Sequence, residues 1–130
     1  MSSTITTGLK RSFTAGGAIS QYRAVQISGS VTVIEADDAV GTKTIGIAGV
    51  SDRSAASGES VTIALANAGG TAFLEMSEAV TAGTAVYATT NGKGALVATT
   101  SNDALIGLAL TSASADGDVI EVLQLGAPSA

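Results

Sequence analysis

The feature of this sequence that most limits its possible folds is an internal repeat. Sliding the chain against itself by 61 residues places alternating apolar segments of one half over similar segments of the other, and a two-residue adjustment extends the match. An ordered match of several elements predicts a duplicated unit of roughly fifty residues, spanning about 12–65 and 73–125. The aligned segments are 18–27 with 79–88, 44–50 with 105–111, and 57–65 with 116–124.

Each copy is a run of short apolar strands separated by turn residues. The pair Asn91-Gly92 favours a hairpin turn, because both residues tolerate the positive φ that a primed turn requires. Helix signals are poor, since β-branched Thr and Val surround the one candidate helix start. The expected strands are 22–28, 31–36, 44–52 and 60–66 in the first copy, 72–76 between the copies, and 84–90, 95–100, 105–113 and 118–125 in the second.

This pattern predicts an all-β fold, a small β-barrel or β-sandwich built from two quasi-repeated strand modules, with an extended N-terminal arm. We expect an arm at 1–13, a single β domain at 14–126 and a C-terminal tail at 127–130. The copies are expected to pair about a pseudo-twofold axis and to supply strands to one shared core, because one copy alone would leave its apolar face and edges uncovered.

Composition and charge exclude several classes of function. The net charge is −5, whereas nucleic-acid binding needs clustered Lys and Arg. The charge is uneven: Lys10 and Arg11 lie in an acid-free N-terminal stretch, while Lys93 is the only basic residue after Arg53. No apolar run is long enough to predict a membrane span, and no secretory signal is recognisable, so we expect synthesis in the cytoplasm.

The sequence predicts no catalytic, cofactor or metal site. Histidine and cysteine are absent, which removes the usual general base, the thiol nucleophile and most zinc sites. Asp37 and Asp38 are adjacent, so on a strand they would point to opposite faces, and no segment has the calcium-loop spacing. Lys93, on a turn between matched halves, raises the alternative of a lipoyl or biotinyl carrier, but glycines flank it where a carrier has Asp, Ala or Met.

The chain from about Thr14 to Leu125 resembles the small capsid cement, or head-decoration, proteins of tailed bacteriophages. Those proteins begin with a polar arm, continue through an Ala-Val strand pair and an acidic stretch to "IGVA", and close with a Gly-acid turn and "V-x-V-x-L-x-G". The matching stretches are "GAISQYRAVQISGSVTVIEADDAVGTKTIGIAG" (17–49) and "AVTAGTAVYATTNGKGALVATTSNDALIGLALTSASADGDVIEVLQLG" (79–126).

The resemblance implies a structural protein without enzymatic activity on the outer surface of the virion. It would bind the major capsid protein of an assembled head, cement neighbouring capsomers and stabilise the head against internal DNA pressure. It would associate with itself, as a homotrimer or alternatively as a dimer. The alternative function is a virion-surface binding module, such as the base of a head fibre or a carbohydrate-contacting domain.

The N-terminal arm supplies the candidate partner interface. Ile5, Leu9 and Phe13 recur every four residues, and Lys10 and Arg11 lie among them. We expect the arm to order on the capsid by adding a strand to an exposed sheet edge, with the two basic side chains meeting carboxylates of the shell. The alternative is that the arm packs along its own barrel or a neighbour's.

Overall fold

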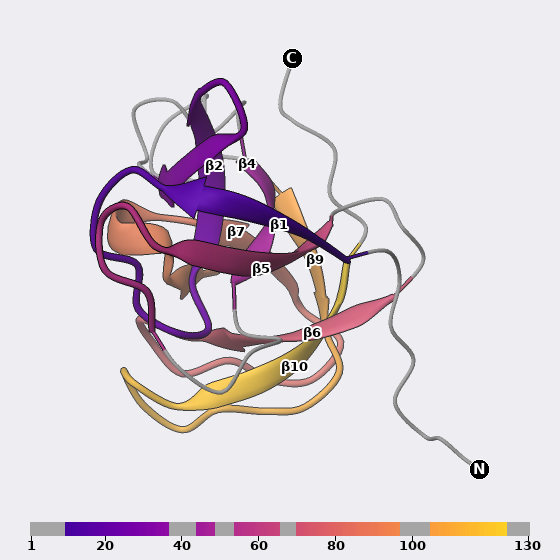
Figure 1. Cartoon of the computed structure of the whole chain (residues 1–130). Coiled ribbons are helices and arrows are strands. Elements are labelled where there is room, and N and C mark those ends of the chain that lie inside the picture. Colours follow the sequence, from indigo (N-terminus) through magenta and orange to yellow (C-terminus); the bar gives the residue numbers. More distant parts are fainter. Residues whose placement is uncertain (1–9, 37–43, 49–53, 66–69, 97–104, 125–130) are drawn as a thin grey trace, which may run out of the picture.

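The computed structural model describes residues 10–36, 44–48, 54–65, 70–96 and 105–124, and in these the chain is all-β, as predicted (Figure 1). The strands are short, and burial alternates along several of them, for example 71–75 and 119–124, as expected where one face of a strand packs on a core. The strands are β1 (Lys10–Ala15), β2 (Ala24–Gly29), β3 (Thr32–Glu35), β4 (Thr44–Ala48), β5 (Ser60–Leu65), β6 (Thr71–Glu75), β7 (Ala85–Ala88), β8 (Gly94–Ala95), β9 (Leu105–Ala109) and β10 (Val119–Gln124), with a 3₁₀ turn η2 (Thr90–Gly92) before β8.

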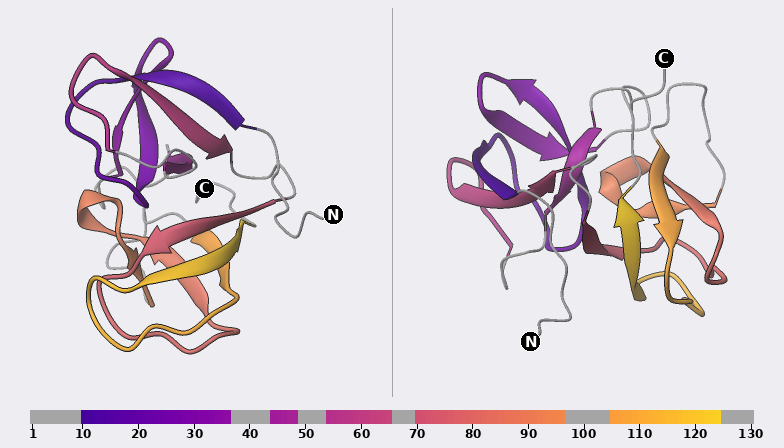
Figure 2. Two further views of the ribbon diagram at one scale, coloured as in Figure 1. Left: turned by 60° about the horizontal axis from the view of Figure 1, so that its bottom comes forward. Right: turned by 90° about the vertical axis from the view of Figure 1, so that its right-hand side faces the viewer.

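Each half of the chain forms a sheet of its own, and Figure 2 shows the two sheets as neighbouring bodies. The first sheet has the order β1-β3-β2-β4-β5 and closes into a barrel, because β1 pairs in parallel with β3 and antiparallel with β5. The second sheet has the order β6-β10-β9-β7-β8. In the second repeat, an isolated parallel bridge joins Met76 and Gly94. These two positions are equivalent to Ala15 and Val33, which pair in the barrel of the first repeat.

The strand registers confirm that the fold consists of two repeated modules. Shifted by 61 residues, β1 and β4 fall on β6 and β9, and shifted by 59 residues β5 falls on β10. The pair Phe13 and Val61 in β1–β5 thereby corresponds to Leu74 and Ile120 in β6–β10. Even the irregularity between β2 and β4 recurs between β7 and β9. The two-residue adjustment that the sequence requires falls before the last strand of each module.

The expected single core is corrected to two cores. Among the described strands none of one repeat pairs with a strand of the other, and the first barrel encloses its own apolar cluster. The closed barrel gives every strand two neighbours, so one repeat does bury its apolar face alone. The second cluster is shared only in part: Ala24, Ala36 and Ala64 of the first repeat pack with the apolar residues of the second.

The Gly-acid turns that the repeats have in common are closed by their acidic side chains. In the second repeat, Asp118 Oδ2 accepts hydrogen bonds from the backbone N–H and hydroxyl of Ser114, at 2.9 Å each, and from the Ala115 N–H at 3.2 Å. These bonds, the Ser114 N–H first, lower the pKa of Asp118. Glu59 has the same role in the first repeat, where its carboxylate accepts the Ala56 N–H at 2.8 Å.

The turn before β8 brings the two repeats into close contact. Gly92 has φ +76°, and a Cβ at this position would overlap the backbone oxygen of Ala24 and lie 3.0 Å from its nitrogen. Gly83 has a similar φ of +94° but open space around the place a Cβ would take. The glycine of the predicted hairpin therefore has two roles: it allows the turn, and it lets the turn approach β2 of the other repeat.

We predict that Gly92→Ala destabilises the chain far more than Gly83→Ala. Both substitutions force an L residue to positive φ, which costs about 1–2 kcal/mol, but only Gly92→Ala also pushes the repeats apart, adding about 1–3 kcal/mol as other overpacked sites do. Urea unfolding of both variants measures the difference. Equal losses of unfolding free energy would show that the turn does not press on Ala24.

Candidate functional site

The five predicted interface residues have different locations. Ile5 and Leu9 lie outside the described residues, while Lys10 and Arg11 begin β1. The exposed Arg11 guanidinium lies over the Phe13 ring, 5.1 Å from its centroid. Phe13 is only 7% exposed and belongs to the barrel core, so it is unavailable to a partner. The last four residues of the expected arm are thus part of the barrel itself.

The other candidate positions show no catalytic arrangement. Asp37 and Asp38 lie outside the described residues. In the part of the chain that the structure describes, no group of three acidic, His or Cys side chains is placed to hold a metal ion. None of the described helices is long and apolar enough to cross a membrane. Lys93, the residue considered as a carrier, lies instead in a network of ion pairs between the two repeats.

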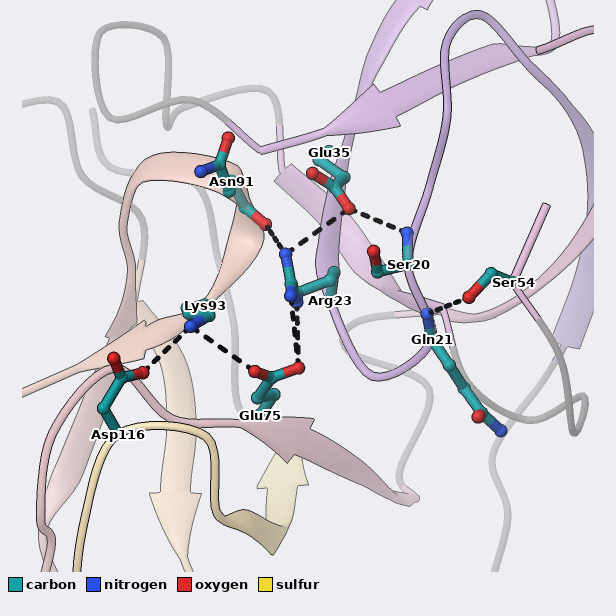
Figure 3. A network of polar contacts seen from close by, with 9 residues as sticks. All are labelled: Ser20, Gln21, Arg23, Glu35, Ser54, Glu75, Asn91, Lys93 and Asp116. Carbon is teal, nitrogen blue, oxygen red and sulfur yellow. Dashed lines mark hydrogen bonds and ion pairs between the residues drawn. The ribbon is translucent and has the colours of Figure 1, made fainter. Parts of the chain in front are cut away.

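Arg23 is the centre of this network, which Figure 3 shows from close by. Its Nε and Nη2 atoms both lie 3.2 Å from Glu75 Oε1, so the guanidinium joins the residue just before β2 to the end of β6. Its Nη1 lies 3.5 Å from Glu35 Oε2 and donates to the backbone oxygen of Asn91 at 3.1 Å. Planar guanidinium groups suit such many-sided contacts, because their donors point in fixed directions.

Glu75 is the member of the second repeat that meets Arg23, and it extends the network within that repeat. Its Oε2 lies 3.4 Å from Lys93 Nζ, which also donates to Asp116 Oδ1 at 2.9 Å. The hydrogen bond to Asp116 is the main cause that raises the pKa of Lys93; Glu75 adds to it and burial acts against it. Lys93 thus pairs with two carboxylates of its own repeat, and one of them, Glu75, meets Arg23 of the other repeat.

The network lies mostly out of solvent. The side chains of Arg23 and Glu75 are 14% and 21% exposed, whereas Asp116 at the rim is 66% exposed. Ion pairs at the surface contribute little, but removal of one partner of a shielded pair leaves a poorly solvated charge. Arg23 and Glu75 should therefore matter most, and Asp116 least.

Backbone and aromatic contacts reinforce the same junction. The Glu75 N–H donates to the Tyr22 oxygen at 2.8 Å, and the Tyr22 and Phe73 rings meet edge to face at 6.4 Å. Tyr22 adopts φ +66° at the position that the second repeat gives to Gly83. On the other side, the buried Gln124 donates from Nε2 to the backbone oxygens of Ala64 and Leu65, at 3.3 and 3.4 Å.

Sequence reasoning missed this junction, although the repeat contains a signal for it. Each charged residue of the network aligns with an uncharged residue at the equivalent position of the other repeat. This difference is expected, because the two repeats meet through different surfaces. The counterparts are Thr84 for Arg23, Leu96 for Glu35, Thr14 for Glu75, Thr32 for Lys93 and Ser57 for Asp116. Charged positions without a charged counterpart therefore mark residues that differ in role between the two modules, and Arg23 and Glu75 at the junction are among them.

Comparison with known proteins gives the family. The sequence profile of the phage cement protein family matches residues 5–124, nearly the whole chain. The chain therefore belongs to the phage cement protein family. It is a structural component of a phage virion, and its family membership implies that it binds the phage capsid. No protein with curated annotation matches the sequence.

One similar solved structure comes from a phage head. It is the N base of the head fibre gp8.5 of bacteriophage phi29, with a TM-score of 0.61 over 89% of this chain and 92% of that chain. The two sequences are 11% identical, so the likeness shows a shared fold. The two-module arrangement described above is therefore found in another chain.

We predict that Arg23→Met and Glu75→Gln each lower the free energy of unfolding by roughly 2–3 kcal/mol, because each breaks the ion pair between the repeats and leaves a shielded charge with only one of its ion-pair partners. The double variant should lose much less than the sum of the two, with a coupling of about 1 kcal/mol or more. Asp116→Asn is the control at the exposed rim and should cost at most about 0.5 kcal/mol. Additive losses in denaturant titrations would contradict the ion pair's role at the junction.

Proposed function

We propose that this chain is a non-enzymatic cement protein that binds the outer surface of the assembled capsid and ties neighbouring capsomers together. The match to the phage cement family over 5–124 is the observation that supports this most strongly. The partner is the major capsid protein, and the protein stabilises the head against the pressure of packaged DNA. The chain is made in the host cytoplasm and joins the virion from outside.

The junction between the repeats suits a cementing role. A protein that binds the assembled shell and not the free subunits stabilises the shell by mass action. A block whose halves are held by shielded ion pairs and close backbone contact has little conformational entropy to lose on docking. Two modules held in this way present surfaces at a fixed separation, which is what a link between two capsomers requires.

The N-terminal segment remains a proposed contact with the shell. Residues 1–9 contain Ile5 and Leu9, and Lys10 and Arg11 follow at the start of β1. Arg11 is exposed, so its guanidinium is open to carboxylates of a partner beside the barrel. We further propose that the protein associates as a homotrimer, with a dimer as the alternative.

A second candidate function is the base of a head fibre. The observation that favours it is the shared fold with the N base of the phi29 head fibre. A fibre base and a cement protein both sit on the outside of a head, but only the cement protein is expected to make the shell itself more resistant to rupture. The effect on the shell therefore separates the two functions.

We predict that purified protein sediments with heads lacking it and raises the temperature at which those heads release DNA. At a protein concentration of 100 Kd, mass action supplies about 2.7 kcal/mol at each site. A deletion of residues 2–9, which leaves β1 whole, should weaken the binding. Binding without any change in the release temperature would favour the fibre base, and unchanged occupancy by the deletion variant would exclude the N-terminal contact.

A further inference from the structure

The outer face of the second sheet has an unusual composition. Phe73, Leu110 and Val119 are 47%, 42% and 41% exposed, and Leu123 is half-buried beside them. Alternate residues of β6 and β10 point outward, since Leu74, Ile120 and Val122 between them are buried. Figure 2 shows β6 and β10 side by side. We call the four outward apolar residues and the glutamate among them the outer face.

Glu121 occupies the middle of this face. It stands opposite Phe73 across the β6–β10 ladder, and its backbone oxygen accepts the Leu110 N–H at 2.8 Å on the other side. Val119 and Leu123 precede and follow it by two positions, so they share its side of the sheet. The Glu121 carboxylate therefore lies among four apolar side chains. Glu75, opposite Val119 on the same side of the sheet, is already paired with Arg23 and Lys93.

The first repeat shows that the fold does not need this composition. The positions equivalent to Phe73, Val119 and Glu121 are Ser12, Ser60 and Thr62, in the same strand register. Ser12 and Ser60 are exposed and Thr62 is half-buried, so small hydroxyl side chains suffice on the outside of the same module. The apolar residues of the second repeat thus have a purpose beyond the fold of the module, and exposed apolar residues grouped on one surface are typical of an interface.

The charge of the face indicates what kind of partner it fits. The half-buried Glu121 carboxylate has no ion pair or hydrogen bond within the described ranges. Covering it with an apolar surface would be costly unless a cation pairs with it. Residues 71–124 hold one basic and six acidic residues, while residues 10–65 hold five of each, so the whole net charge of −5 belongs to the repeat with this face.

We propose that the outer face docks on a partner surface that brings one arginine or lysine to Glu121 and apolar side chains to the residues around it. The partner, on the proposed function, is the outer surface of the assembled capsid shell. A second copy placed face to face would bring two Glu121 carboxylates together between apolar residues, which like charges oppose. The cationic partner group must therefore come from a different surface.

The test replaces residues of the outer face by the residues that the first repeat has at the equivalent positions. The double variant Val119→Ser, Glu121→Thr uses residues that the same module already tolerates, and it keeps Phe73, whose ring packs on Tyr22 at the junction. We expect it to bind undecorated heads at least about tenfold more weakly than the unchanged chain, as removal of central contacts does at other interfaces. Val31→Ser is the matched control, because Val31 is 44% exposed on the first repeat and lies outside the face; its binding should not change.

A second variant tests the charge alone and does not disturb packing. Glu121→Gln should weaken binding and make it less sensitive to added salt, because a charge-assisted contact with the partner is lost. Glu78→Gln removes an exposed carboxylate of the same repeat whose contact, an accepted hydrogen bond from the Leu96 N–H at 3.0 Å, an amide can replace. It should leave binding unchanged.

The outcomes separate this proposal from the proposed function. If the unchanged chain binds heads and both Glu121 variants bind equally well, the outer face is not the docking surface and the cement function stands. If the unchanged chain does not bind heads, the cement function fails and the shell is not the occupant. If the double variant lowers only the mass of the free protein in analytical ultracentrifugation, the occupant is a second copy, and the proposal is overturned.

Discussion

The contact between the two repeats is centred on one ion pair, that between Arg23 and Glu75. The two repeats have separate sheets, so no ladder of hydrogen bonds between strands holds them together. The guanidinium supplies a bidentate contact to Glu75 and reaches Glu35 and the Asn91 carbonyl as well. Around it, Gly92 permits close approach to Ala24, and on the opposite side the Gln124 amide binds two carbonyls of β5. Without this junction the chain would be a small barrel and a second sheet module joined by a linker, and a loosely joined pair transmits less force between two attachment points.

The parts of the fold that were predictable from sequence are those that repeat. The 61-residue shift, the short alternating strands and the glycine turns together predicted two β modules, and the strand registers agree with that prediction. Closure of the first repeat was not predictable from alternation, because it depends on the parallel pairing of β1 with β3, which no local pattern encodes. The same gap explains Phe13: its four-residue spacing from Leu9 suggested a contact with a partner, whereas its place on β1 puts its ring inside the barrel.

Differences between the repeats are as informative as their similarities. Residues needed by the module itself recur in both copies, as Glu59 and Asp118 do in closing equivalent turns. Residues needed for a contact outside the module occur in one copy, as Arg23 does at the junction and Phe73 and Glu121 do on the outer face. The chain thereby uses one fold twice and gives the copies different chemistry: a neutral first repeat with an exposed Arg11, and an acidic second repeat with an apolar face. A link between capsomers needs such a pair of unlike surfaces on one rigid block.

The most direct measurement is electron cryo-microscopy of heads with and without this protein. The account predicts paired densities of two small β modules on the outside of the shell, bridging neighbouring capsomers, with the β6–β10 side of the second module against the shell. The same density would be missing from heads that lack the protein. Density inside the shell, or a single attachment that touches one capsomer only, would contradict the central claim that the protein is a rigid link on the capsid surface.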